Sequence, residues 1–373
     1  MARQNPLHRL QQLGQSVWLD YIERGFIADG RLARVIEENG VNGLTSNPAI
    51  FYQAIAQHDA YARAIAAMAR DGLAAHEIYE ALVIQDIRAA ADALAGVHER
   101  TGGRDGYVSL EVSPHFARDA EGTFWEAKRL WALVDRRNLM IKVPGTVEGM
   151  TAVQRLTAAA INVNVTLLFS VERYELAAEA FTAGLEQRVA ANESVAGIAS
   201  VASFFLSRID ALVDQRIESS AEPRAQGLRG QCAIACARLA YEHFQVRTQT
   251  PRWRSLSSRG ARPQRLLWAS TGTKNPASYS DVKYVDALIG PDTITTLPVE
   301  TFIDYRDHGD PALRLQDAGS ATNAHELVRG LVALGIDINL VARHLEEEGI
   351  RKFIEPYEAT LVALRGRVAK LAS

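Results

Sequence analysis

The chain contains little that would suit a secreted, membrane-bound or nucleic-acid-binding protein. Its 373 residues include only two cysteines, too few for a disulfide framework. No apolar run approaches the roughly 20 residues of a membrane span, and the start, "MARQNPLHRLQQLGQ", lacks the apolar core of a signal peptide. The net charge of −3 produces no field that favours nucleic acid or an anionic membrane. We therefore expect a cytoplasmic protein with neither kind of partner.

Several signatures of known site chemistries are also missing. The chain has no G-x-G-x-x-G after its first strand-like segment and no G-x-x-x-x-G-K-[ST], the dinucleotide and P-loop motifs. The serine-hydrolase elbow G-x-S-x-G is absent. No two of the nine histidines have the close spacing of zinc ligands. Cys232 and Cys236 lie four apart without a histidine nearby, so we expect two small buried side chains rather than metal ligands.

What the sequence does contain is an alternation of strand-like and helix-like segments. Helical spacing is clearest in 119–138, where apolar residues such as Phe124, Ala127 and Leu130 recur at three- and four-residue steps. The expected strands are rich in Val, Ile, Leu and Thr and are bounded by Gly, Pro, Asn or Asp. They cover 15–22, 43–48, 106–114, 138–144, 160–169, 195–205, 264–271 and 292–298.

This alternation predicts an α/β fold with a mostly parallel sheet. Eight units favour one closed (β/α)8 TIM barrel that takes up 1–373 as a single domain, with its strands within 15–298. Additional helices are expected at the N-terminus, between the second and third strands (49–100), and in a C-terminal extension (299–373). A doubly wound open sheet is the structural alternative.

One stretch departs from the pattern. Residues 246–265, "VRTQTPRWRSLSSRGARPQR", are rich in Arg, Ser, Gly and Pro. The stretch could form a mobile basic lip over an anionic site. A solvated loop is the favoured interpretation, because runs of charge usually lie in solvent.

Polar residues occur near the carboxyl ends of several expected strands. In "NLMIKVPGTVEGM", Lys142 interrupts an apolar run, although burying an unpaired ammonium is costly. Side chains two apart point to the same face of a strand, which places Glu111 with Ser109 and Asn164 with Thr166. In the first expected strand, Asp20 shares a face with Trp18. A barrel would gather these groups at one mouth, where barrel active sites lie.

A lysine in such a setting predicts Schiff-base chemistry. Burial and nearby cations favour the neutral amine of a lysine, and a neutral amine can attack a carbonyl. The protonated imine is then an electron sink for cleaving the neighbouring C–C bond, with Glu111 and Asp20 as candidate proton shuttles. The alternative is a structural ion pair between Lys142 and Glu111.

Later strands offer groups for a phosphate. "SFFLSRID" carries Ser203 and Arg208, and "WASTGTKNP" carries Ser270 and Lys274. A Ser/Thr/Gly turn that enters a helix can bind phosphate through its backbone N–H groups, and barrels often do so near strands 7 and 8. Ordinary N-capping of a helix is the alternative.

Together, "GLTSNPAIF", "SLEVSP", "MIKVPGT", "NVNVTLLFS", "SFFLSRID" and "LLWASTGTKNP" resemble the transaldolase family, in its longer bacterial and plant-type branch. The resemblance covers residues 16 to about 300, with the motifs in family order. It implies a class I aldolase barrel that moves a dihydroxyacetone unit from sedoheptulose 7-phosphate to glyceraldehyde 3-phosphate. The products would be erythrose 4-phosphate and fructose 6-phosphate, in the non-oxidative pentose phosphate pathway. It also implies no metal or organic cofactor, sugar phosphates as partners, and a monomer or homodimer.

The resemblance assigns roles by position. Lys142 matches the Schiff-base lysine, Glu111 with Thr166 and a bound water matches the groups around carbinolamine formation, and Asp20 matches the general acid/base. The residues that match contacts to substrate are Asn47, Asn164, Ser203, Phe205, Arg208, Ser270 and Lys274. The chain departs from shorter members in having "WLDYI" around the aspartate and a lysine, not an arginine, after strand 7.

Two other functions are weighed against this one. A fructose 6-phosphate aldolase-like enzyme would release free dihydroxyacetone, but such relatives are shorter and carry Gln and Tyr where this chain has Glu111 and Phe205. A non-catalytic barrel could bind sugar phosphates, but it would have no need for Lys142, Glu111 and Asp20 together.

Overall fold

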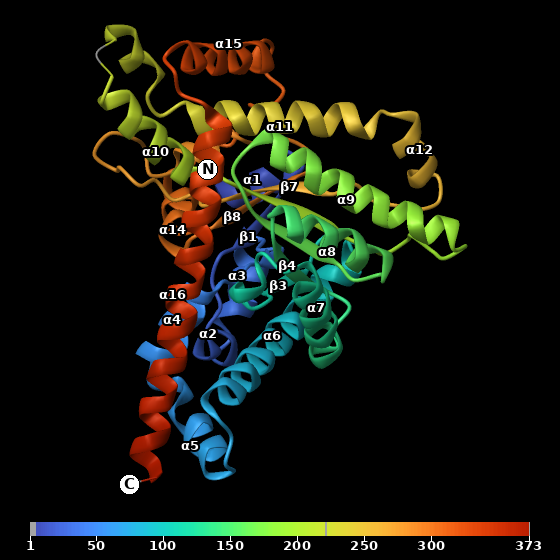
Figure 1. The fold of residues 1–373 in the computed structure, drawn as a ribbon, viewed down its shortest axis with the longest axis vertical. Coiled ribbons are helices and arrows are strands. Elements are labelled where there is room, and N and C mark those ends of the chain that lie inside the picture. The colour runs from blue at the N-terminus through green and yellow to red at the C-terminus, as the bar shows by residue number, and fades with distance from the viewer. Residues whose placement is uncertain (1–4, 221, 373) are drawn as a thin grey trace.

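Eight parallel strands form a closed barrel in the computed structural model, which describes residues 5–220 and 222–372 (Figure 1). Each strand pairs with the next in sequence, and β8 returns to β1. The closure confirms the (β/α)8 prediction and rules out the open sheet. The strands are β1 (Gln15–Leu19), β2 (Gly43–Leu44), β3 (Tyr107–Glu111), β4 (Leu139–Pro144), β5 (Val163–Leu168), β6 (Ser200–Phe205), β7 (Arg265–Ala269) and β8 (Thr293–Leu297).

All eight lie within the expected segments, and each is shorter than its segment. As a fraction of the expected length, the difference is largest in β2, which was expected over 43–48 and ends at Leu44. Asn47 has left the ladder because its side chain caps the next helix by accepting a hydrogen bond from the Ile50 N–H at 3.1 Å. Such capping side chains compete with strand pairing. Asn47 therefore lies at the start of α4 rather than in a strand.

The helices cover the barrel and extend it on one side. They are α1 (Pro6–Gln12), α2 (Arg24–Ala28), α3 (Arg31–Asn39), α4 (Pro48–Gln57), α5 (Ala62–Arg70), α6 (Ala75–Arg100), α7 (Ala120–Val134), α8 (Val147–Ala158), α9 (Val171–Ala190), α10 (Ser207–Glu218), α11 (Cys232–Thr248), α12 (Pro251–Ser257), α13 (Lys283–Ala287), α14 (Val299–His308), α15 (Ser320–Ala333) and α16 (Ile338–Ala372). Short 3-10 turns occupy Asp59–Tyr61 (η1), Pro114–Phe116 (η2) and Pro223–Leu228 (η3). Additional helices lie at the three predicted places in the sequence, and further ones lie between β1 and β2 and between β6 and β7, where none was expected.

The last helix, α16, is the element that the barrel pattern does not account for. It is 35 residues long and runs along one side of the molecule, from α15 at one end to α5 at the other (Figure 1). It packs against α4, α5, α6 and α10, and Arg367 ties it to the carbonyl groups of Ile55 and Ala56. Residues far apart in sequence are thereby brought to the rim of the barrel.

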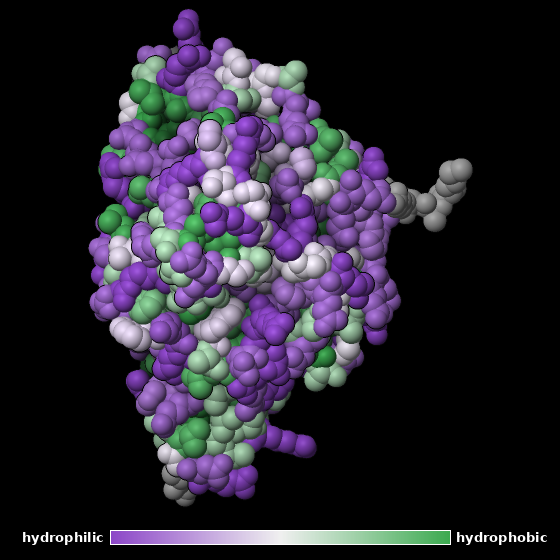
Figure 2. All heavy atoms as spheres, turned by 90° about the vertical axis from the view of Figure 1, so that its right-hand side faces the viewer, coloured by the Kyte–Doolittle hydropathy of each residue, from purple (hydrophilic) through white to green (hydrophobic). Residues whose placement is uncertain are grey.

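The core consists of the barrel interior and the layer between strands and helices. Every residue of β1, β4, β5, β6, β7 and β8 is buried. The face seen in Figure 2 is mostly hydrophilic, with apolar atoms in small separate groups. Within the described residues, no helix is both long and apolar enough to cross a membrane.

Two local expectations were wrong. About half of the 246–265 stretch is helical, because α11 continues to Thr248 and α12 covers Pro251–Ser257. Arg252 is held by Glu179 and Glu186 of α9 at 2.7 Å. The stretch leads into the first residue of β7, so it lies at the amino end of the barrel, away from the mouth. The turn after β7 does not enter a helix directly, because α13 begins only at Lys283.

The amino end of the barrel holds a buried ion pair between Arg265 and Asp105, with Nη2 and Oδ1 2.8 Å apart. Arg265 also donates to the Ser16 hydroxyl at 2.9 Å and to the Arg104 carbonyl at 2.7 Å. Ser16 and Trp18 donate to the Asp105 carboxylate in turn. Both charged groups therefore have hydrogen-bonding partners, which is the condition under which buried charges are tolerated.

Candidate active site

Lys142 lies in β4, near its carboxyl end, and is 4% exposed. The register of the sheet places it directly between Glu111 of β3 and Asn164 of β5. These side chains point into the barrel as the alternation of the strands predicts. Three of the sequence-predicted residues are therefore neighbours across adjacent strands.

The Lys142 ammonium is only loosely held. Its Nζ donates a hydrogen bond to the Ser46 carbonyl at 3.1 Å, and it lies 5.9 Å from the centre of the Phe353 ring. The nearest carboxylate oxygen, Glu111 Oε2, is 4.0 Å away, which is too far for a hydrogen bond. The alternative of a structural ion pair between Lys142 and Glu111 is therefore met only by a 4.0 Å contact that lacks a hydrogen bond.

Two carboxyl groups near this lysine are suited to proton transfer. Burial raises the pKa of Glu111 to about 7, although the charge of Lys142 opposes the shift. Burial also raises the pKa of Asp20, against Lys142 and a 2.6 Å hydrogen bond donated by Thr45. A general acid or base works best with a pKa near the working pH, so Glu111 can hold or release a proton near neutrality.

Behind the lysine, polar side chains form a fixed chain. Ser203 donates to the Asn164 Oδ1 at 2.6 Å, and the Asn164 amide donates to the Ser109 hydroxyl at 3.0 Å. Thr166 is fully buried, and its hydroxyl makes no hydrogen bond to any described residue. It lies at an irregularity in the pairing of β5 with β6, next to Leu167 with φ of 59°. Such bulges re-aim side chains beside active sites.

A cavity of about 180 Å³ opens above the lysine at the carboxyl end of the barrel. Eight of the predicted residues line it: Asp20, Asn47, Lys142, Ser203, Phe205, Arg208, Ser270 and Lys274. The other three, Glu111, Asn164 and Thr166, do not line it. Asn164 and Thr166 lie buried beneath it, and Glu111 lines a neighbouring cavity. The structure thus brings eight of the eleven predicted residues to one mouth, with Asn164 and Thr166 beneath it and Glu111 beside it.

The rim of this cavity is cationic. Arg208, in the first turn of α10, and Lys274, in the loop after β7, both have a lowered pKa because they are desolvated. The charges of Arg208 and Lys352 add to the shift at Lys274. Ser270, with φ of 55°, shares a 2.9 Å hydrogen bond with Ser207 and fixes the two loops together. Clustered cations that repel each other favour an anion such as phosphate.

Sequence reasoning missed part of the site. Thr45 and Thr296 share a 2.8 Å hydrogen bond beside Asp20 and line the cavity, and their nearness to "GLTSNP" and β8 could have indicated them. Lys352 and Phe353 come from α16. Nothing in the sequence placed that helix over the mouth, because its residues follow an ordinary surface-helix pattern.

The two cysteines lie away from this cavity. Cys232 and Cys236 are buried in α11, with sulfur atoms 4.0 Å apart, as predicted for small core residues. Among the residues that the structure describes, no group of three or more His, Cys, Asp or Glu side chains is placed to hold a metal ion.

A family model and several similar proteins point to the same family. The family model described as "Transaldolase/Fructose-6-phosphate aldolase" matches residues 17–364. A protein named transaldolase from Thiobacillus denitrificans is 46% identical over 95% of this chain and 98% of its own length. Another from Trichodesmium erythraeum is 46% identical over 98% of each. "Transaldolase 2" from a Nostoc species is 44% identical over 99% of each. The chain therefore belongs to the transaldolase/fructose-6-phosphate aldolase family.

Proposed function

We propose that this protein is a transaldolase. It transfers a dihydroxyacetone unit from sedoheptulose 7-phosphate to glyceraldehyde 3-phosphate, giving erythrose 4-phosphate and fructose 6-phosphate, a reaction of the non-oxidative pentose phosphate pathway. The observation that carries this is the loosely held Lys142 amine with Glu111 4.0 Å away, at the base of a mouth with a cationic rim. The family membership supports the same reaction.

In this mechanism Lys142 begins the reaction. Its amine attacks C2 of the ketose, and a proton passes from the attacking nitrogen to the C2 oxygen, which becomes a hydroxyl. Glu111 donates a proton to that hydroxyl, which leaves as water while the nitrogen lone pair forms the C=N bond. Glu111, whose pKa is about 7, is suited to donate this proton and to take it back. Thr166, whose hydroxyl makes no hydrogen bond to any described residue, assists by holding the water.

Asp20 acts on the next bond. It takes the proton of the C4 hydroxyl, the C3–C4 bond breaks, and its electrons flow into the imine, which becomes an enamine. The aldose phosphate leaves and the three-carbon unit stays on Lys142. The chain of hydrogen bonds from Ser203 through Asn164 holds the hydroxyls of that unit. Asn47 contacts sugar hydroxyls, and Phe205 packs beside them.

Phosphate is held by the cationic rim. Arg208 and Lys274 grip it, and the Ser270 hydroxyl contributes a hydrogen bond. Lys352, which comes from α16 and also pairs with Glu348, adds positive charge. Charge-assisted hydrogen bonds of this kind are shorter and stronger than neutral ones.

The alternative in this family is release rather than transfer. The test is to give the protein fructose 6-phosphate with and without glyceraldehyde 3-phosphate or erythrose 4-phosphate as acceptor. We expect sugar exchange only when an acceptor is present. Rapid free dihydroxyacetone without acceptor would favour an aldolase, and no turnover in either case would favour a binding protein.

The proposal also covers the cellular location, the oligomeric state and the number of domains. The protein acts in the cytoplasm, as a monomer or homodimer, and residues 1–373 fold as one domain. Sedimentation velocity measures the oligomeric state. A single cooperative unfolding transition by calorimetry is expected for one domain, whereas two separate transitions would contradict it.

A further inference from the structure

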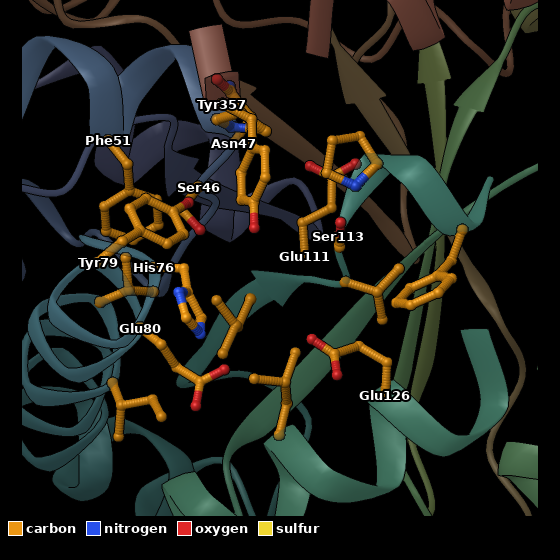
Figure 3. Close-up of a pocket in the computed structure, with 18 of the residues that line it drawn as sticks. Ser46, Asn47, Phe51, His76, Tyr79, Glu80, Glu111, Ser113, Glu126 and Tyr357 are labelled. Atoms are coloured by element: carbon orange, nitrogen blue, oxygen red, sulfur yellow. The ribbon is translucent and has the colours of Figure 1, made fainter. Parts of the chain in front are cut away.

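A second cavity, of about 280 Å³, lies beside the active-site mouth (Figure 3). It is enclosed by α4, α6, α7 and the turn after β3, with Tyr357 of α16 at one side. Its walls combine apolar side chains such as Phe51 and Val83 with polar ones. A single buried water needs about 10–15 Å³, so this cavity can hold several.

The cavity runs from solvent to the catalytic carboxylate. At one end His76 is exposed, and the side chains of Arg129 and Glu80 are 46% and 34% exposed. At the other end the Glu111 side chain is only 4% exposed. Figure 3 shows His76 and Glu80 lying apart from Glu111, which extends beside Ser113 and Tyr357. The cavity is therefore a passage with an open rim and a buried end.

Lys142 and Glu111 lie in different cavities. The cavity of about 180 Å³ above Lys142 is called the sugar cavity here. Lys142 lines the sugar cavity and not the second one, whereas Glu111 lines the second one and not the sugar cavity. Only 4.0 Å separates the ammonium from the carboxylate. Both Glu111 oxygens are buried and accept no hydrogen bond from any described residue. Buried polar atoms in a roomy polar site are normally satisfied by water.

We propose that the second cavity is a water port, through which the water expelled by imine formation leaves and the water consumed by imine hydrolysis enters while the sugar phosphate occupies the mouth. This inference rests on the proposed function. Each imine step releases or consumes one water molecule. In imine formation the carbinolamine C–O bond breaks, its hydroxyl takes the Glu111 proton, and one water is produced. In hydrolysis one water adds to the C=N carbon and returns its proton to the Glu111 carboxylate.

The port can be tested by following oxygen exchange at C2 in a variant that forms the imine but does not cleave the sugar. An Asp20→Asn variant should form the imine with fructose 6-phosphate but not cleave it. In water enriched in ¹⁸O, repeated imine formation and hydrolysis then place label at C2, if the expelled water exchanges with bulk. Label at C2 is measured by mass spectrometry, and borohydride-trapped imine is measured on the same samples. The slow exchange without enzyme is subtracted.

Two plugs from different elements are added to the Asp20→Asn background. Ser113→Leu fills the buried end from the turn after β3, and Val83→Phe fills the wall from α6. Ser113→Ala is the matched control for the first plug, because it removes the hydroxyl without filling space. Ile87→Phe, at a fully buried position of the same helix that does not line the cavity, is the control for the second.

We expect each plug to reduce C2 labelling to nearly the uncatalysed rate, with the trapped imine unchanged and both controls labelling normally. Labelling that equals the control would overturn the port, because the water would then use the mouth. An equal fall in labelling and in trapped imine would also overturn it, since the plug would then act on the chemistry of Glu111. Failure of the proposed function is separate, because it would show as no imine and no acceptor-dependent transfer in the unsubstituted protein.

Discussion

The two ends of this barrel each bury a cation beside a carboxylate, but the two pairs differ in their separation and in their hydrogen bonds. At the amino end, Arg265 and Asp105 are 2.8 Å apart, and Ser16 donates to the same carboxylate. At the carboxyl end, Lys142 and Glu111 are 4.0 Å apart, and the Glu111 oxygens accept no hydrogen bond from any described residue. The Asp105 carboxylate is therefore hydrogen-bonded within the protein, whereas the Glu111 carboxylate is not hydrogen-bonded to any described residue.

This difference distinguishes a pair that stabilises the fold from a pair that is available for catalysis. A buried charge is costly unless it is paired and hydrogen-bonded, so the Arg265–Asp105 pair is arranged to minimise that cost. The Lys142–Glu111 pair leaves the cost in place, which raises the pKa of Glu111 to about 7. Groups with perturbed pKa values in a cleft are candidates for catalysis. The unsatisfied pair is therefore the one available to react.

The largest effect is expected at the unsatisfied pair. Glu111→Gln keeps the shape of the side chain and removes its proton transfer, so kcat should fall by about 10²–10⁴, with secondary structure retained. Steady-state kinetics and circular dichroism measure the two. The matched change at the other end, Asp105→Asn, should leave the kcat of the folded protein nearly unchanged. A similar loss of kcat in both variants would contradict the comparison.

The satisfied pair should matter for stability instead. Asp105→Ala leaves Arg265 buried without its partner, so the free energy of unfolding should fall by about 3–5 kcal/mol. Urea unfolding followed by circular dichroism measures the change. If Asp105→Ala costs less than Glu111→Ala, the amino end does not carry the structural role assigned to it.

A smaller effect concerns pH and stability. The folded pKa of Glu111 is raised from 4.5 to about 7, so between these values the folded state binds the proton more tightly than the unfolded chain. The contribution of Glu111 to stability is therefore present below pH 4.5 and is lost as pH rises to 7.

Glu111→Gln removes that dependence. At pH 8 the variant should be more stable than the unsubstituted protein by on the order of 1–3 kcal/mol, and the difference should shrink toward pH 5. Urea unfolding of both proteins across this pH range measures it. A difference that does not vary with pH would show that Glu111 has an ordinary pKa.

The smallest expected effect is at the phosphate rim. Lys274→Met should raise KM for fructose 6-phosphate about fivefold, roughly 1 kcal/mol for an exposed charge, and should leave KM for unphosphorylated fructose nearly unchanged. Lys128→Met, an exposed lysine on α7 away from the mouth, is the control. Equal changes for both sugars would make Lys274 structural. Arg208→Gln should act in the same direction.

The sequence predicted the barrel and most of the site because both follow from short-range patterns. Alternation along β3, β4 and β5 places Glu111, Lys142 and Asn164 side by side, which the register confirms. It could not place Lys352 and Phe353, since their position depends on how α16 packs across α4 and α10. The 246–265 stretch was misjudged because its arginines pair with carboxylates of α9, which composition does not show.

The most direct test of the account is where the imine forms. The protein is incubated with fructose 6-phosphate, reduced with borohydride, digested and mapped by mass spectrometry. The account predicts a single three- or six-carbon adduct on Lys142, and none in a Lys142→Met variant. An adduct on Lys274 or Lys352, or no adduct at all, would contradict the claim that the loosely held lysine in β4 is the nucleophile.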